Sequence, residues 1–292
     1  MKKGIIYALI TAILFVTLEP VSKLIAADVN PYTITLWRFM IGSLILIPPA
    51  VTKIKKDNLK LDKKDFILMT LLGILFICIS MVLLQVGVQK ADTPALIAII
   101  FSSNSVFTIL FAAIIVKEKI SKEKFVALIL GIAGVVICAD FTSGTNLLSV
   151  ILGILAALSF SLYTALSQKY MKKTGGIVQT SIVFLTGSIV LLISLIALRI
   201  DVVPDFTLKN TSLLLYLGFL VTGVGYACYF KAIENGGAIM ASLAFFIKPV
   251  LTPFVTFFIN GITPEPKVFV AVACIICASY FAAYKGKSLK TH

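Results

Sequence analysis

The chain has 292 residues, of which 59% are hydrophobic and 13% charged, whereas a soluble domain has about 45–50% apolar and about 25% charged residues. So few charged side chains cannot supply the polar shell that a soluble globular enzyme needs, and the composition excludes one. The formal net charge is +13 at pH 7. The basic residues are scattered through short loops and form no single basic face, so we expect no nucleic-acid partner.

Apolar runs long enough to cross a bilayer, about 20 residues each, follow one another along the whole chain. We predict ten membrane-spanning helices, at residues 4–26, 31–51, 66–86, 94–116, 124–140, 150–170, 177–199, 211–231, 238–259 and 267–285. The expected fold class is therefore an all-α integral membrane protein. The first span follows Met1-Lys2-Lys3 as a signal peptide would, but its apolar run is too long and Glu19-Pro20 interrupts it, so we expect it to be retained.

The distribution of Lys and Arg predicts the orientation, because positively charged loops stay in the cytoplasm. Nineteen of the 26 Lys and Arg residues fall on the side of the N-terminus, and three lie within spans. The four on the opposite side are Lys90, Arg199, Lys209 and Lys267. We therefore expect both termini in the cytoplasm of a bacterial-type cell, with the protein in its inner membrane.

The two halves of the chain match each other at an offset of 145 residues. The matching pairs are Gly42 with Gly187, Gly73 with Gly218, Ala12 with Ala157, and Asn104 with Pro249. We predict two repeats of five spans, at residues 1–143 and 148–287. An odd number of spans gives the second repeat the opposite orientation, and transporters built from inverted repeats bind substrate near the middle of the membrane, between the repeats.

Short motifs occur in corresponding places of both halves. They are Trp37-Arg38-Phe39 in the second span, Ser105-Val106-Phe107-Thr108 and Lys117-Glu118-Lys119-Ile120-Ser121 around the end of the fourth, and Lys248-Pro249-Val250-Leu251-Thr252 and Gly261-Ile262-Thr263 in the second half. With these motifs in this order, the sequence resembles the drug/metabolite transporter superfamily, in its bacterial ten-span EamA branch. Ser103-Asn104-Ser105 stands where that family has a proline, so we expect less kinking in the first half.

The resemblance implies a central cavity lined by spans 1–4 and 6–9. It implies a homodimer contact at spans 5 and 10, which lie at the periphery. It also implies alternating access, used for export.

Charged residues inside the membrane cost several kcal/mol and usually face a cavity or a partner. Glu19 and Arg38 lie at similar depths, ~6 Å and ~4–5 Å to the outer side of their span midpoints at a rise of about 1.5 Å per residue. We predict that they form an ion pair, with either a structural or a functional role. Lys23 is near enough to the outer interface for its ammonium group to snorkel.

Lys248 lies at the centre of the ninth span, too deep to snorkel. If Arg38 neutralises Glu19, no other acidic residue remains within the spans to pair with Lys248. We expect Lys248 to bind the carboxylate or phosphate of a substrate. The alternative is that it bonds carbonyl groups left free by Pro249 and Pro253.

Polar and aromatic residues within the spans complete the predicted site. The candidate substrate-binding residues are Lys248, Glu19, Arg38, Trp37, Tyr163, Gln85, Asn104, Tyr226 and Tyr229. Glu19 is also the candidate for proton coupling. We expect no metal site and no cofactor, because the single histidine is the last residue, His292, and the five cysteines lie in apolar runs.

These features predict a secondary active transporter that exports a small polar or zwitterionic metabolite, such as an amino acid, by alternating access. Its partners would be that small-molecule metabolite and the lipid bilayer. The alternative is a flippase for lipid or lipid-linked headgroups. A membrane-embedded enzyme is disfavoured, because the interiors of the spans contain one acidic residue, Glu19, and no histidine.

Overall fold

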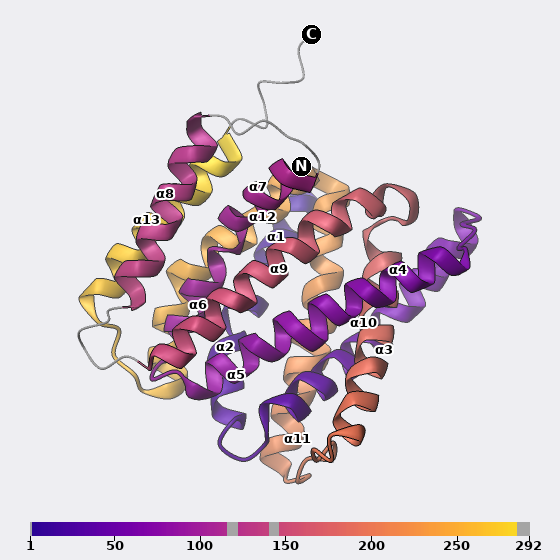
Figure 1. Cartoon of the computed structure of the whole chain (residues 1–292), viewed down its shortest axis with the longest axis horizontal. Helices are drawn as coiled ribbons and strands as arrows, with labels where there is room; N and C mark the ends of the chain where they lie inside the picture. Colours follow the sequence, from indigo (N-terminus) through magenta and orange to yellow (C-terminus); the bar gives the residue numbers. More distant parts are fainter. Residues whose placement is uncertain (1, 116–121, 140–145, 285–292) are drawn as a thin grey trace.

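The structure is a computed structural model that describes residues 2–115, 122–139 and 146–284. In this part of the chain the regular elements are all helices, packed side by side in one bundle (Figure 1). They are α1 (Lys2–Val16), α2 (Leu18–Ile25), α3 (Pro31–Lys56), α4 (Lys63–Gly73), η1 (Ile74–Met81), α5 (Val82–Lys90), α6 (Pro94–Ser102), α7 (Asn104–Ile115), α8 (Lys122–Ala139), α9 (Leu147–Thr174), α10 (Gly176–Ala197), α11 (Leu208–Leu215), η2 (Tyr216–Val224), α12 (Gly225–Asn260) and α13 (Pro266–Tyr284). The segments η1 and η2 are π-helices.

Several of these helices are long and apolar enough to cross a membrane. Within the described residues there are six such stretches: Lys3–Ile25, Pro31–Lys56, Lys63–Lys90, Leu147–Ser167, Gly176–Ala197 and Leu208–Ala232. Shorter apolar helices at Pro94–Thr108, Phe125–Gly134, Ile247–Asn260 and Pro266–Ala278 coincide with the other predicted spans. The all-helical class is confirmed, and the number of ten spans stays a prediction.

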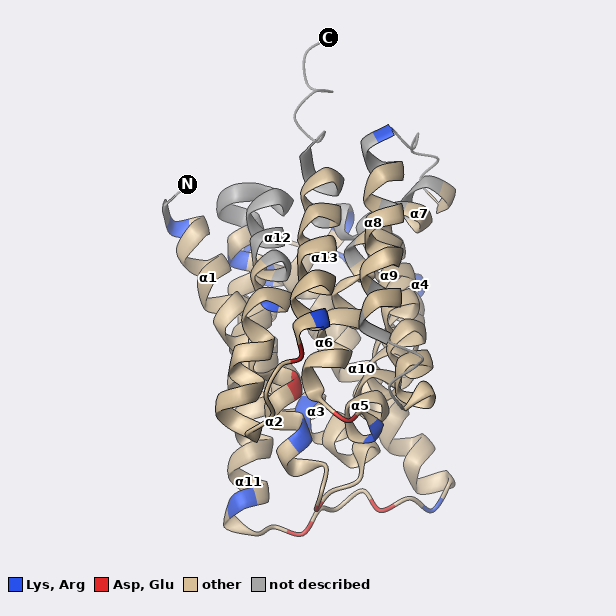
Figure 2. Ribbon diagram, turned by 90° about the vertical axis from the view of Figure 1, so that its left-hand side faces the viewer, with Lys and Arg blue, Asp and Glu red and all other residues tan. Residues whose placement is uncertain are grey.

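Most charged residues lie toward the two ends of the bundle, and the helices between are largely uncharged (Figure 2). The beginning of α1 and the end of α13 lie at the same end (Figure 2). We call the opposite end, where α2, α5 and α11 lie, the outer end, following the predicted orientation.

The first predicted span is divided at Thr17 into α1 and α2. Pro20 has no N–H group to donate to the carbonyl of Val16, four residues earlier, so the helix cannot continue regularly through this point. The Thr17 hydroxyl bonds the Leu14 carbonyl and the Tyr216 hydroxyl, each at 2.8 Å. The break directs α2 and its residue Glu19 toward the centre of the bundle.

The fourth predicted span is also divided, at Ser103, into α6 and α7. The side chains of Ser102, Ser103 and Asn104 each donate to a carbonyl of the preceding turn, at 2.6–2.7 Å. Such bonds compete with the regular helix ladder and bend helices. The expectation that the missing proline leaves this half less kinked was therefore wrong, because three polar side chains interrupt the helix in its place.

Two glycines allow α4 and α10 to touch along their backbones. A Cβ atom on Gly73 would lie 2.8 Å from the Val183 carbonyl oxygen, and one on Gly187 would lie 2.7 Å from the Gly73 carbonyl oxygen. Any side chain at these positions would force the helices apart. Small residues at such contacts are typical of helix packing in membranes.

Gly73→Ala is expected to lower the stability of the fold by about 1–3 kcal/mol, the usual cost of overpacking. Gly87→Ala, on α5, is the matched control, because its Cβ atom would meet Leu152 at an ordinary 3.5 Å. Alanine also favours the helix over glycine by about 1 kcal/mol, so the control should be neutral or stabilising. Thermal unfolding of the purified variants in detergent measures both, and equal melting temperatures would contradict the close contact.

Two hydrogen bonds link the halves of the chain in equivalent places. The Thr11 hydroxyl donates to the Gly225 carbonyl at 3.3 Å, and the Ser80 hydroxyl donates to the Ala156 carbonyl at 2.9 Å. At the offset of 145 residues, Thr11 corresponds to Ala156 and Ser80 to Gly225. The two bonds are thus the same contact with donor and acceptor exchanged.

Candidate functional site

A small cavity lies at the centre of the bundle, where most of the long helices meet. Its lining residues are Phe15, Leu18, Arg38, Met81, Leu84, Phe101, Phe160, Val221, Tyr226 and Lys248. Its volume is about 20 Å³, close to the space that one water molecule needs. A metabolite can occupy this site only after the surrounding helices move apart.

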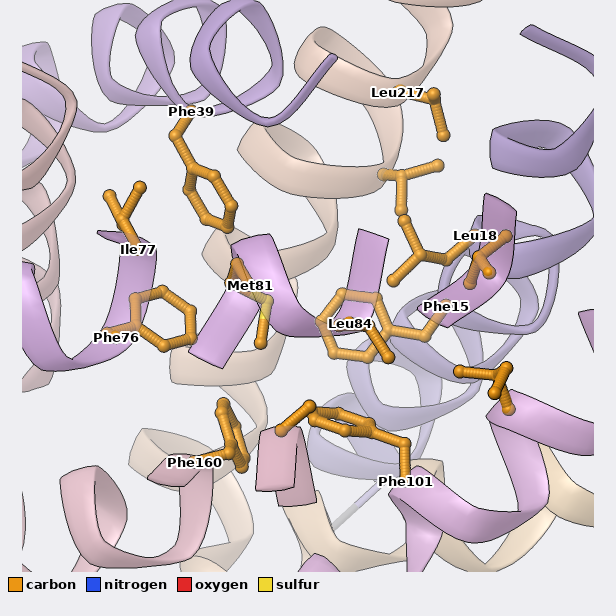
Figure 3. Packing of buried hydrophobic residues seen from close by; sticks show 14 of the residues in the cluster. Phe15, Leu18, Phe39, Phe76, Ile77, Met81, Leu84, Phe101, Phe160 and Leu217 are labelled. Atoms are coloured by element: carbon orange, nitrogen blue, oxygen red, sulfur yellow. The ribbon is translucent and has the colours of Figure 1, made fainter. Parts of the chain in front are cut away.

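The walls of the central cavity are mainly apolar and aromatic. Phe15, Met81, Leu84, Phe101 and Phe160 come from five different elements and point toward one another (Figure 3). The rings of Phe15, Phe101 and Phe160 offer flat faces on which an aromatic or cationic ligand can stack.

A second aromatic group extends this wall around Phe76. The ring of Tyr163 stacks on Phe76 with centroids 4.5 Å apart, and Tyr226 meets Phe184 edge-on at 5.1 Å. Tyr229 lies behind Tyr226, with ring centroids 6.4 Å apart. The predicted tyrosines therefore belong to one cluster, of which Tyr226 reaches the central cavity.

Glu19 and Lys248 form a buried ion pair beside the cavity. The Lys248 Nζ donates to the Glu19 Oε1 at 2.6 Å, and the two side chains are 3% and 0% exposed. The prediction that Lys248 lacks a protein partner was wrong, as was the predicted Glu19–Arg38 pair. The reason is tertiary: α2 packs against α12, which brings Lys248 to the carboxylate. Among the residues that the structure describes, Lys248 donates to Glu19 and to no carbonyl freed by Pro249 or Pro253.

Arg38 is the cation at the cavity without a carboxylate. Its Nε donates to the Thr222 Oγ1 at 2.8 Å, its Nη2 lies 3.9 Å from the Met81 Sδ, and its guanidinium lies 4.7 Å from the centre of the Phe39 ring. Within the described residues, no acidic side chain forms an ion pair with it. Arg38 is 2% exposed and its guanidinium has five N–H donors, so an anion in the cavity would find donors there.

Glu19 also keeps bonding capacity. Its second oxygen, Oε2, is buried and has no hydrogen-bond partner in the part of the chain that the structure describes. A buried carboxylate oxygen without a donor is costly. The cavity region thus combines a guanidinium that lacks an anion with a carboxylate oxygen that lacks a donor.

The other predicted site residues have different surroundings. The Trp37 indole donates to the Val202 carbonyl at 2.8 Å and packs edge-on against Phe206. Trp37 therefore anchors the connection between α10 and α11 and does not line the central cavity, which corrects its predicted role. Its place next to Arg38 in the sequence turns it to another face of α3.

Gln85 and Asn104 are buried in the bundle and do not line the central cavity. The Asn104 amide donates to the Phe101 carbonyl at 2.6 Å, so it shapes the break between α6 and α7. The Gln85 Nε2 has no partner among the described residues. A site that includes Gln85 stays a prediction.

Lys23 does not snorkel as predicted. Its Nζ donates to the carbonyls of Gln89 and Ala91, at 2.9 and 2.6 Å, at the C-terminal end of α5. In return, the Gln89 amide donates to the Ala26 carbonyl at 3.2 Å. A cation at a helix C-terminus satisfies its last carbonyls, and Lys23 therefore fixes α2 to α5.

Sequence reasoning missed Thr222 as a site residue. Its hydroxyl is fully buried, accepts from Arg38 and donates to the Leu217 carbonyl within η2. The available signal was a polar residue in an apolar run. The wide turn of η2 that places it was not predicted, because π-helical segments have no distinctive composition.

A bundle of apolar helices around a few buried charged residues is typical of a membrane transporter, and the comparisons with known proteins agree. This chain belongs to the EamA-like transporter family, whose defining pattern matches residues 2–139 and again residues 147–284. It is a multi-pass membrane transporter and not an enzyme.

Relatives and one solved structure match most of the chain. An uncharacterized transporter of Clostridium kluyveri is 38% identical, over 99% of this chain and 97% of that one. An uncharacterized transporter of Bacillus subtilis is 27% identical over 80% and 76% of the two chains. An S-adenosylmethionine uptake transporter of Rickettsia bellii is 23% identical over 92% and 89%. The superposition on one crystal structure covers both chains completely, with a TM-score of 0.69 and 15% identity. The two proteins therefore share the fold.

Proposed function

We propose that this transporter moves a small zwitterionic metabolite, with an amino-acid-like carboxylate and ammonium group, by alternating access. The observation that carries the proposal is Arg38, a buried guanidinium at the central cavity without a carboxylate among the described residues. Arg binds carboxylates through paired, charge-assisted hydrogen bonds. The unpartnered Glu19 Oε2 offers an acceptor for the ammonium group.

Alternating access requires two halves that move against each other. We propose the inverted repeat of two five-span units, residues 1–143 and 148–287, as the basis of this motion. The separate family matches to each half support it, as do the equivalent Thr11 and Ser80 bonds. Shifted by 145 residues, η1 overlaps η2, so both halves have a π-helix in corresponding places.

The direction and the assembly complete the proposal. We propose that transport is outward and that both termini lie in the cytoplasm, although the Rickettsia bellii relative is named an uptake transporter. S-adenosylmethionine itself has a carboxylate, an ammonium group and an aromatic base, and so falls in the proposed substrate class. For the homodimer we propose α8 and α13, which pack together at one edge of the bundle (Figure 1).

A thermal-shift screen of the purified protein tests the substrate class. The panel contains amino acids, S-adenosylmethionine, purines, sugar phosphates, polyamines and quaternary amines. A ligand at a hundred times its Kd adds ~2.7 kcal/mol of stability if it binds only the folded state. We expect zwitterions to raise the melting temperature, and polyamines and quaternary amines to leave it unchanged.

Radiolabelled forms of the stabilising compounds are then followed in proteoliposomes, with efflux and uptake measured separately. Stabilisation by cations alone would overturn the zwitterion proposal. Movement of fluorescent lipids, without movement of any soluble compound, would favour the flippase.

A further inference from the structure

A second cavity lies at the outer end of the bundle, between α6, α12 and the connection to α13. Its volume is about 130 Å³, and its lining includes Thr93 and Leu96 of the α6 end, Pro253 and Thr256 of α12, and Glu265 before α13. We call it the outer pocket. It is larger than the central cavity and has polar groups on its walls.

The same two helices line both cavities. α6 contributes Leu96 to the outer pocket and Phe101 to the central cavity, and α12 contributes Thr256 and Lys248. α6 and α12 pack against each other along this length. The contact between them, which we call the α6/α12 seam, therefore separates the two cavities.

A row of polar side chains runs along α12 at this level. Lys248, Thr252 and Thr256 follow at intervals of four residues, which places them on one face of the helix, and they are 3%, 0% and 1% exposed. The Thr252 hydroxyl donates to the Lys248 carbonyl at 2.7 Å, and the Thr256 hydroxyl has no partner among the described residues. A buried hydroxyl without a partner costs stability, so this row is not explained by packing alone.

Contacts with α2 hold this part of α12 in place. The Glu19–Lys248 ion pair fixes its inner end, and the Asn260 amide donates to the Pro20 carbonyl at 3.2 Å at its outer end. Pro249 and Pro253 remove two backbone donors from α12 between these points, which weakens the helix there. α6 ends at the break around Ser103. Both sides of the seam are thus segments that can move separately from the inner half of the bundle.

We propose that the α6/α12 seam is the route between the central site and the outer side, that Thr252 and Thr256 line it, and that the Glu19–Lys248 ion pair closes it. The proposal rests on the proposed function for its substrate. A zwitterion at the site replaces one ion pair by two, its carboxylate binding Lys248 together with Arg38 and its ammonium binding Glu19. Charge stays balanced while α12 is released from α2. A simple anion or cation leaves one member of the pair without a partner, so it does not open the seam.

Cysteine labelling tests the route without any substrate. Thr252→Cys and Thr256→Cys are made in a variant whose five native cysteines are replaced, and intact cells are treated with a charged, membrane-impermeant methanethiosulfonate. Ser188→Cys is the matched control: Ser188 is 0% exposed, its hydroxyl also has no partner among the described residues, and it lies on α10 outside both cavities. Each variant is compared with and without Glu19→Gln, which removes the ion pair.

We expect Thr256→Cys to react faster than Ser188→Cys even with the ion pair intact. Thr252→Cys should react slowly with the pair intact and about tenfold faster or more with Glu19→Gln, because the open population rises. A Thr256→Cys rate equal to that of the control would overturn the route. A Thr252→Cys rate unchanged by Glu19→Gln would overturn the closing role of the pair.

If Glu19→Gln unfolds the protein, Ser188→Cys also becomes reactive, and Lys248→Gln then replaces it as the second way to remove the pair. The Thr256→Cys comparison with the pair intact decides the route in either case. Because no substrate is used, a negative ligand screen with positive labelling would reject the proposed substrate class and keep the route. A positive ligand screen with a Thr256→Cys rate equal to that of the control would keep the proposed substrate class and reject the route.

Discussion

Arg38→Gln is expected to reduce transport about a hundredfold and to leave the fold at least as stable as before. Transport falls because the substrate carboxylate loses charge-assisted hydrogen bonds worth ~1.5–3 kcal/mol, and about 2.7 kcal/mol corresponds to a factor of one hundred. Stability does not fall, because the substitution removes a buried charge that has no carboxylate partner among the described residues. Initial transport rates in proteoliposomes and thermal unfolding measure the two effects.

Three variants show whether this loss is specific. Arg38→Lys keeps the charge but not the paired donors, so we expect most of the activity to be lost. Thr222→Val removes the acceptor that orients the guanidinium and should reduce transport about tenfold, in line with one hydrogen bond. Lys173→Met removes an exposed cation of α9, which pairs with Asp65 away from the cavity, and should leave the rate unchanged. Wild-type transport by Arg38→Gln would contradict the assignment of Arg38 to the substrate.

Breaking the Glu19–Lys248 ion pair is expected to have the largest effect on stability. Glu19→Gln and Lys248→Met should each cost about 3–5 kcal/mol, because removing one partner leaves the other as an uncompensated buried charge. The double variant should regain much of this loss, since both charges are then gone. Unfolding of the four proteins forms a double-mutant cycle whose coupling term measures the pair.

The coupling between these two positions should be several times larger than that between Glu19 and Arg38, which do not touch. Glu19→Gln combined with Arg38→Gln provides this comparison. If the two cycles gave equal coupling, Arg38 and Lys248 would share the carboxylate, and the pairing seen in the structure would be contradicted.

The sequence was a good guide to the helices and a poor guide to their neighbours. Apolar runs and the Glu19-Pro20 dipeptide were sufficient to place the helices and the first break, because chain length and missing N–H groups act locally. The depth of Glu19 along its helix was also predictable from the rise per residue. Depth does not say which helix stands opposite, however: the predicted depth of Glu19 matched that of Arg38, whereas the structure pairs Glu19 with Lys248.

The partner of Glu19 therefore depended on contacts between segments more than 200 residues apart in the chain, which no local pattern encodes. The same holds for Thr222, which the π-helical turn of η2 brings to Arg38. Ser102, Ser103 and Asn104 illustrate the opposite case. Their tendency to bond nearby carbonyls is local, and weighing it against the missing proline would have predicted the break between α6 and α7.

The buried ion pair has an uncharged counterpart in the other half of the chain. At the offset of 145 residues, Glu19 corresponds to Thr164 and Lys248 to Ser103, and both hydroxyls donate to a carbonyl of the preceding turn. In the proposed mechanism, opening the outer side thus separates opposite charges in a medium of low permittivity, whereas the equivalent opening in the other half disturbs the uncharged Thr164 and Ser103. In that mechanism the two opening steps have unequal activation barriers, and the opening that breaks the ion pair is the slower of the two.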